Sequence, residues 1–110
     1  MESKYKNKKT QIDMYIFDST KEAKRYRELK LLEMAGEISN LELQPRFLLQ
    51  ESFKKNGKTY RKIEYVADFK YIEKGKTKVE DVKGLQTDVF KIKHKLFEKK
   101  YPELELRIIE

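Results

Sequence analysis

The sequence predicts an α/β domain whose elements run in the order helix, three strands, helix, strand. Apolar residues recur at three-residue steps after Ser19, alternate along residues 63–71, and take a helical pattern again after Thr87. The length of 110 residues suits one compact domain. We therefore expect a flexible basic arm over residues 1–10 and a single domain over residues 11–110.

The composition narrows the class of protein. Lys and Arg number 26 against 19 Asp and Glu, and the net charge of +7 favours a polyanionic partner such as nucleic acid. The chain has no Cys and only one histidine, His94, so disulfides and a Cys/His zinc site are excluded and any metal must have oxygen ligands. No apolar run approaches the ~20 residues of a membrane-spanning helix. We expect a cytoplasmic protein that is neither secreted nor anchored.

The first helix is predicted over residues 19–35, and Gly36 supplies a left-handed stop. Its apolar stripe consists of Ala23, Tyr26, Leu29 and Leu32. Ser19 and Glu22 have the spacing of a capping box, in which the Glu22 carboxylate would accept a hydrogen bond from the Ser19 backbone N–H. On local grounds, capping is a sufficient explanation of Glu22.

Three strands joined by tight turns are predicted next. An apolar run indicates a strand over about residues 46–53, and Asn56-Gly57 favours a hairpin turn. The second strand alternates, with one face formed by Ile63, Tyr65, Ala67, Phe69 and Tyr71. A second turn at residues 73–76 leads to a third strand over residues 77–83.

The second helix begins at Thr87 or Asp88 and ends at Tyr101-Pro102, before a last short strand over residues 104–108. We expect its apolar stripe to consist of Val89, Ile92, Leu96 and Phe97. The helix also carries Lys91, Lys93, Lys95 and Lys99. These lysines suit contacts to DNA phosphates that carry no sequence information, although an ordinary solvated helix face, which includes His94, explains them equally well.

The register of the second hairpin brings two acids together. If the turn is centred on Lys74-Gly75, Asp68 faces Asp81 on the neighbouring strand. Directly opposed side chains have Cβ atoms about 4.5–5.5 Å apart, and like charges repel at that separation. A divalent cation between the carboxylates would remove the repulsion, and Mg²⁺ commonly uses one or two carboxylates together with substrate phosphate.

Lys83 extends this group because it lies two residues beyond Asp81 and therefore projects from the same face of the strand. Two acids, a metal ion and an ammonium group can hydrolyse a phosphodiester, with Lys83 orienting the water or stabilising charge on the phosphate. A surface ladder of salt bridges is the structural alternative. Gln44, which precedes Pro45, is interpreted as an ordinary loop amide.

The order of these residues along the chain, with Glu22 on the first helix, Asp68 on the second strand and Asp81-Val82-Lys83 on the third, resembles the PD-(D/E)XK nuclease superfamily. More narrowly, it resembles a family of small phage-encoded proteins within that superfamily. The segments that carry the resemblance are Phe17-Asp18-Ser19-Thr20-Lys21-Glu22-Ala23, Leu43-Gln44-Pro45, Tyr65-Val66-Ala67-Asp68-Phe69 and Val79-Glu80-Asp81-Val82-Lys83-Gly84. Similar motifs occur in TnsA-like transposon end nucleases and some Holliday junction resolvases. Ala67 replaces the proline of the motif, and Glu80 could exchange with Asp81 if the strand contained a bulge.

The resemblance implies a restriction-endonuclease-like core, with a central mixed sheet flanked by helices, and a Mg²⁺-dependent DNA endonuclease of phage or prophage origin. It assigns Asp68, Asp81, the Val82 carbonyl and Glu22 to the metal, for which Mn²⁺ substitutes, and makes Lys83 the catalytic lysine. Branched DNA is one expected substrate. A homodimer and phage recombination or replication proteins are the expected partners, within the bacterial host cytoplasm. The alternative is a DNA-binding or accessory subunit that cleaves nothing.

Overall fold

The computed structural model describes residues 10–13 and 15–110. The arm predicted for residues 1–10 lies outside the described residues except for Thr10, which begins the first strand. Two helices and ten strands are found in the described part of the chain. Their bounds are β1 Thr10–Ile12, β2 Tyr15–Phe17, α1 Thr20–Met34, β3 Ser39–Leu43, β4 Arg46–Gln50, β5 Phe53–Lys55, β6 Lys58–Tyr60, β7 Ile63–Val66, β8 Phe69–Glu73, β9 Lys76–Val82, α2 Asp88–Lys100 and β10 Glu105–Ile109.

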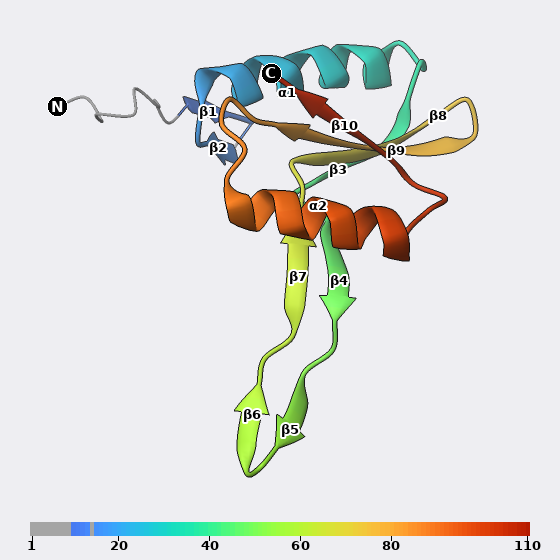
Figure 1. The fold of residues 1–110 in the computed structure, drawn as a ribbon. Coiled ribbons are helices and arrows are strands. Elements are labelled where there is room, and N and C mark those ends of the chain that lie inside the picture. Colours follow the sequence, from blue (N-terminus) through green and yellow to red (C-terminus); the bar gives the residue numbers. More distant parts are fainter. Residues whose placement is uncertain (1–9, 14) are drawn as a thin grey trace, which may run out of the picture.

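The central sheet has four strands in the order β10-β9-β8-β3. The β9–β10 pair is parallel because α2 forms the crossover between them, whereas the other two pairs are antiparallel. The helices α1 and α2 lie on opposite sides of this sheet (Figure 1). The prediction of a mixed sheet flanked by two helices is therefore confirmed. In the described residues, no helix is long and apolar enough to span a membrane.

Helix α1 forms as the sequence predicts. The hydroxyl of Ser19 accepts a hydrogen bond from the Glu22 backbone N–H at 3.1 Å, which caps the first turn. At the other end, Gly36 has a φ of +80°, a conformation that favours glycine. The predicted apolar stripe of α1 packs on one face of the sheet with Phe69 and Tyr71.

The predicted apolar stripe of α2 is wrong in three of its four residues. Val89, Ile92 and Leu96 are 62%, 60% and 42% exposed, whereas Phe97 is fully buried. The helix is rotated so that its aromatic residues enter the core, where they pack with partners from the strands. This cluster consists of Phe47, Tyr65, Phe90, Phe97 and Tyr101. Aromatic side chains bury the largest area, and so they, rather than the smaller aliphatic residues, determine the orientation.

Two predicted strands are each divided, and the sequence does not predict β1, β2, β3 or β6. The segment predicted as residues 46–53 is divided into β4 and β5, and the alternating segment over residues 63–71 is divided into β7 and β8. β3 and β8 form one pair and β4 and β7 another, and the chain bends between the two pairs. At the bend, the Gln44 N–H donates to the Asp68 carbonyl at 2.9 Å. Gln44 has a φ of 51° there, and Pro45 has no N–H to continue a ladder.

The register of the second hairpin is as predicted. Phe69 pairs with Glu80 and Glu73 with Lys76, without a shift between these ends. Lys74 and Gly75 form the turn, with φ angles of 52° and 77°. The side chains of β8 and β9 therefore have the predicted relation to the two faces of the sheet.

Candidate active site

Asp68 and Asp81 come together where β8 begins and β9 ends. Asp68 lies just outside β8, and its N–H donates to the carbonyl of Glu80, the ladder partner of Phe69, at 3.0 Å. The Asp68 carboxylate accepts a hydrogen bond from the Val82 N–H at 2.7 Å. Asp81 is only 2% exposed and accepts a hydrogen bond from the Tyr65 hydroxyl. This burial does not fit a surface ladder of salt bridges.

The two aspartates lie in a pocket of about 510 Å³. Its lining consists of Asp18, Ser19, Glu22, Asp68, Asp81, Val82, Lys83, Gly84 and Leu85. A second hollow of about 340 Å³ also contains Glu22 and Asp68, together with Gln44. The acidic group is therefore reached from two sides, and all four residues expected to carry the chemistry share the larger pocket.

Burial and like charge both act on the acids of this pocket. Burial raises the pKa of Asp68 to about 8; the Val82 N–H bond opposes this rise, and contacts with Asp81 and Glu22 add to it. The pKa of Glu22 is also raised, mainly by burial and then by the charges of Asp18 and Asp81, while Lys83 acts in the opposite direction. The acids are thus close enough to disfavour one another's ionised forms.

Lys83 is the cation of the larger pocket. Its Nζ lies 3.4 Å from Asp81 Oδ1 and 4.7 Å from the centroid of the Phe90 ring. Its backbone N–H donates to the Ile109 carbonyl at 2.9 Å, which ties the end of β9 to β10. The Lys83 side chain is 28% exposed and lines the pocket.

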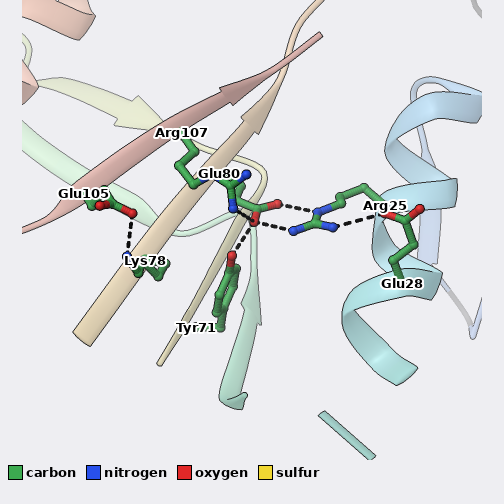
Figure 2. A network of polar contacts seen from close by, with 7 residues as sticks. All are labelled: Arg25, Glu28, Tyr71, Lys78, Glu80, Glu105 and Arg107. Carbon is green, nitrogen blue, oxygen red and sulfur yellow. Dashed lines mark hydrogen bonds and ion pairs between the residues drawn. The ribbon is translucent and has the colours of Figure 1, made fainter. Parts of the chain in front are cut away.

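Glu80, the neighbour of Asp81, lies on the opposite face of β9. It is fully buried and binds Arg25 through two hydrogen bonds of 2.7 Å, to Nε and to Nη2 (Figure 2). The Tyr71 hydroxyl donates to the same carboxylate, and an Arg107 nitrogen lies 3.9 Å away. The bulge that would exchange the two acids does not occur, because the β8–β9 register is continuous.

Glu22 combines a place in the first turn of α1 with a place in the pocket. The Ser19 hydroxyl satisfies the Glu22 N–H, which is the Ser19 half of the predicted capping box. The Glu22 carboxyl lines both hollows beside Asp68. Its position therefore suits more than capping.

The basic residues of α2 lie outside both hollows. Lys91, Lys95 and Lys99 follow a four-residue spacing and form one exposed row, whereas Lys93 is half-buried on another side of the helix. The predicted set of four lysines is therefore not one surface. His94 contacts Glu98 at 3.1 Å and stacks on Phe90, and it lines neither hollow.

Sequence reasoning missed three residues of the site. Tyr65 was assigned only to the apolar face of a strand, and nothing in the spacing signals its hydrogen bond to Asp81. Gln44 was interpreted as a loop amide, but it lines the second hollow. Asp18 lies at the larger pocket and directly precedes the helix cap, a position that could have suggested it.

The chemistry of the donors suits a hard cation. Carboxylate oxygens and a backbone carbonyl are the ligands that Mg²⁺ and Mn²⁺ prefer, and the pKa of Asp68 is raised first by burial and then by the neighbouring charges of Asp81 and Glu22. Within residues 10–13 and 15–110, no group of three or more Asp, Glu or His side chains already has a metal-holding arrangement. A metal would therefore be held by two carboxylates with the carbonyl and water, or after a movement of Glu22.

Comparison with known proteins adds the family. Searches of curated proteins and of solved structures each found no match. One protein-family model matches residues 2–110, which is nearly the whole chain. The chain therefore belongs to the family described as "Protein of unknown function (DUF1064)".

Proposed function

We propose that this protein is a Mg²⁺-dependent DNA endonuclease with the restriction-endonuclease-like arrangement of the PD-(D/E)XK superfamily. The observation that carries the proposal is the pair of buried Asp81 and half-buried Asp68, which lie together in a pocket that also contains Lys83. Glu80 has cationic and hydroxyl partners, whereas in the described residues the ion pair of the two aspartates is limited to Lys83, 3.4 Å from Asp81. An acid pair without enough compensation is a signature of functional sites.

The residues of the pocket divide into ligands and a cation that acts on the substrate. Asp68, Asp81 and the Val82 carbonyl would hold Mg²⁺, with Glu22 as a further acid. A bound Mg²⁺ would supply Lewis-acid stabilisation of the negative charge that develops on the phosphate. Mn²⁺ would substitute because it accepts the same oxygen donors.

Lys83 would stabilise charge on the phosphate or orient the attacking water. Its Nζ is held near Asp81 by charge and above Phe90 by a cation–π contact, so its position is restricted while it stays accessible. The exposed row on α2 formed by Lys91, Lys95 and Lys99 would contact phosphates farther along the DNA. Lys93, on another side of the helix, would contribute less.

A cleavage assay tests the proposal. Supercoiled plasmid and a four-way junction are incubated with purified protein in Mg²⁺, in Mn²⁺ and in EDTA. We expect cleavage with either metal, none in EDTA, and none by Asp81→Asn. Asp88→Asn is the matched control because it removes an exposed aspartate outside the pocket. Equal cleavage by wild type and Asp81→Asn would refute the assignment.

One observation favours a second function, a DNA-binding or accessory subunit without catalysis. In the described residues, no three acidic or histidine side chains already have a metal-holding arrangement. Protonation of Asp68 can stabilise the acid pair without a metal. Calorimetric titration with Mn²⁺ separates the two functions. Heat of binding that disappears in Asp81→Asn supports the nuclease, whereas a silent titration with and without DNA supports the binder.

A further inference from the structure

A narrow ribbon projects from the body of the protein beside the pocket. β4 pairs with β7 and packs with it against α2, and the β5–β6 pair continues beyond them, away from the central sheet and both helices (Figure 1). Every residue from Gln50 to Lys62 is exposed, so the outer part of the ribbon packs against nothing else in the described protein. We call residues 51–62 the basic ribbon.

The basic ribbon is built to keep its shape without support from the core. Phe53 and Tyr60 are direct partners across β5 and β6, and their rings stack with centroids 4.9 Å apart and an interplanar angle of 10°. Asn56 and Gly57 form the turn with φ angles of 52° and 75°, the left-handed pair that a tight hairpin requires. Stacked cross-strand aromatic pairs stabilise isolated ribbons. The ribbon is therefore a formed element rather than a loose loop.

Charge is concentrated on this element. The basic ribbon carries five cations against the single acid Glu51, a net charge of +4 out of the +7 of the whole chain. The cations are Lys54, Lys55, Lys58, Arg61 and Lys62. In the described residues, the only acidic contact of this set joins Lys62 to Glu64 at 3.6 Å, near the base. The other four cations are free to bind an anion.

The position of the ribbon relates it to the pocket. β7 ends at Val66, two residues before Asp68, so the same strand leads directly into the acid pair. At about 3.3 Å per residue, the ribbon reaches roughly 30 Å from this point to its turn. A polyanion that lies in the pocket and continues along the ribbon therefore meets positive charge from Lys62 outward to the turn.

We propose that the basic ribbon binds the phosphate backbone of duplex DNA next to the pocket. A two-stranded ribbon fits the major groove of DNA, which is about 12 Å wide. The ribbon lysines are distributed along both strands. This distribution matches the two lines of phosphates that border the groove better than it matches a single compact acidic site on a protein. The stacked rings of Phe53 and Tyr60 face each other, so charge rather than base stacking dominates the contact. The inference depends on the proposed function only in naming DNA as the ligand.

The test measures binding without chemistry. A fluorescein-labelled duplex long enough to extend from the pocket to the turn is titrated by anisotropy, in EDTA, between about 50 and 200 mM salt. The ribbon variant combines Lys54→Ala, Lys55→Ala and Lys58→Ala. The matched control, which loses the same charge from exposed positions elsewhere, combines Lys24→Ala, Arg27→Ala and Lys76→Ala. Thermal unfolding checks that both variants are folded.

We expect the ribbon variant to bind about tenfold more weakly or worse at low salt. The slope of log affinity against log salt should fall by about 2 to 3, because each lost phosphate contact removes about 0.9. The control should change much less. A ribbon variant that binds with the affinity and slope of the control overturns the inference and points to an acidic protein partner instead, and a wild type that binds no DNA also overturns it.

The result for the ribbon can be distinguished from the result for the proposed nuclease function. A wild type that cuts nothing but loses DNA binding when the ribbon lysines are removed refutes the nuclease and supports the ribbon. A wild type that cuts DNA, with a ribbon variant that binds and cuts equally well, refutes the ribbon alone.

Discussion

Glu80 and Asp81 are consecutive acids on one strand with opposite surroundings. Glu80 faces α1 and is fully buried with Arg25, the Tyr71 hydroxyl and a more distant Arg107 around it. Asp81 faces the pocket, where it meets Asp68, the Tyr65 hydroxyl and Lys83 at 3.4 Å. Strand alternation alone therefore puts one acid in a neutralised network and the other beside a second acid.

The contrast distinguishes an acid that stabilises the fold from the acid proposed to bind a metal. Burial does not separate them, since Glu80 is 0% and Asp81 is 2% exposed. Charged partners do: Arg25 binds Glu80 through two nitrogens at 2.7 Å, whereas Asp81 has Lys83 at 3.4 Å and a second acid, Asp68, whose pKa is raised to about 8 by burial and then by the charges of Asp81 and Glu22. A buried acid with a complete set of partners stabilises the fold, and one with too few is available for a ligand.

Asp81→Asn gives the largest expected effect. We expect nicking of supercoiled DNA to fall below detection, because the substitution removes a proposed oxygen ligand of Mg²⁺. The melting temperature should stay level or rise in EDTA, since a like-charge contact with Asp68 disappears and Tyr65 can still donate to the amide oxygen. Plasmid assays and thermal unfolding measure the two quantities. A clear loss of stability would contradict the distinction between the two acids.

Glu80→Gln should have the opposite effects to Asp81→Asn: stability should fall, and nicking should be retained. It leaves the Arg25 guanidinium without its main counter-charge, and breaking a buried ion pair in this way typically lowers the free energy of unfolding by about 3–5 kcal/mol. The control is Glu28→Gln, which removes the exposed partner of Arg25 and should change stability by less than about 1 kcal/mol. Urea titration measures both. Equal effects of the two substitutions would count against a special role for Glu80.

Asp68→Asn should change the pH dependence of stability. Because the pKa of Asp68 is raised in the native state, the folded protein binds a proton that the unfolded chain releases, and the stability of wild type in EDTA should fall as pH rises from about 4 to about 8. The variant lacks this fall and should be more stable by at least about 1 kcal/mol at pH 8. Denaturant titrations across this range test it.

The same titrations give a metal readout. Mn²⁺ should restore stability to wild type at high pH, because it binds the deprotonated carboxylates of the native state, and it should do little for Asp68→Asn. Wild-type stability that is flat with pH, or equal stabilisation of both proteins by Mn²⁺, would show that Asp68 is as well compensated as Glu80.

Gln44→Ala has the smallest expected effect. Gln44 lines the second hollow beside Glu22 and Asp68, and its N–H holds the Asp68 carbonyl at 2.9 Å. The backbone bond survives the substitution, so stability should change little, while loss of the amide should reduce cleavage about tenfold, as for residues that support metal ligands. Cleavage at the wild-type rate would restore the interpretation of Gln44 as a loop amide.

The sequence predicts the parts of the site that depend on strong local signals. The turn at Lys74-Gly75 and the alternation around it fix the β8–β9 register, and hence the meeting of Asp68 with Asp81. The Ser19 cap likewise places Glu22 in the first turn of α1. Each signal spans only a few residues, so no tertiary information is needed.

What could not be predicted depends on competition between distant parts. Helix α2 has apolar residues on two faces. Phe90 enters the core in place of Val89 because it packs there with aromatic residues of β4 and β7. The bend at Gln44 needs a positive φ in a residue type that rarely adopts one. The bond from Tyr65 to Asp81 likewise depends on that bend, which no local pattern encodes.

The turn of Lys74 and Gly75 has a consequence for how this protein tolerates change in length. It lies at the far end of β8 and β9 from Asp68 and Asp81, and no irregularity between them can absorb an added residue. A residue inserted into β9 between the turn and Glu80 would reverse the side that every following side chain of the strand faces, exchanging Glu80 with Asp81. The number of residues between the turn and the acids therefore decides which acid faces the pocket, although the turn lies at the other end of the strand.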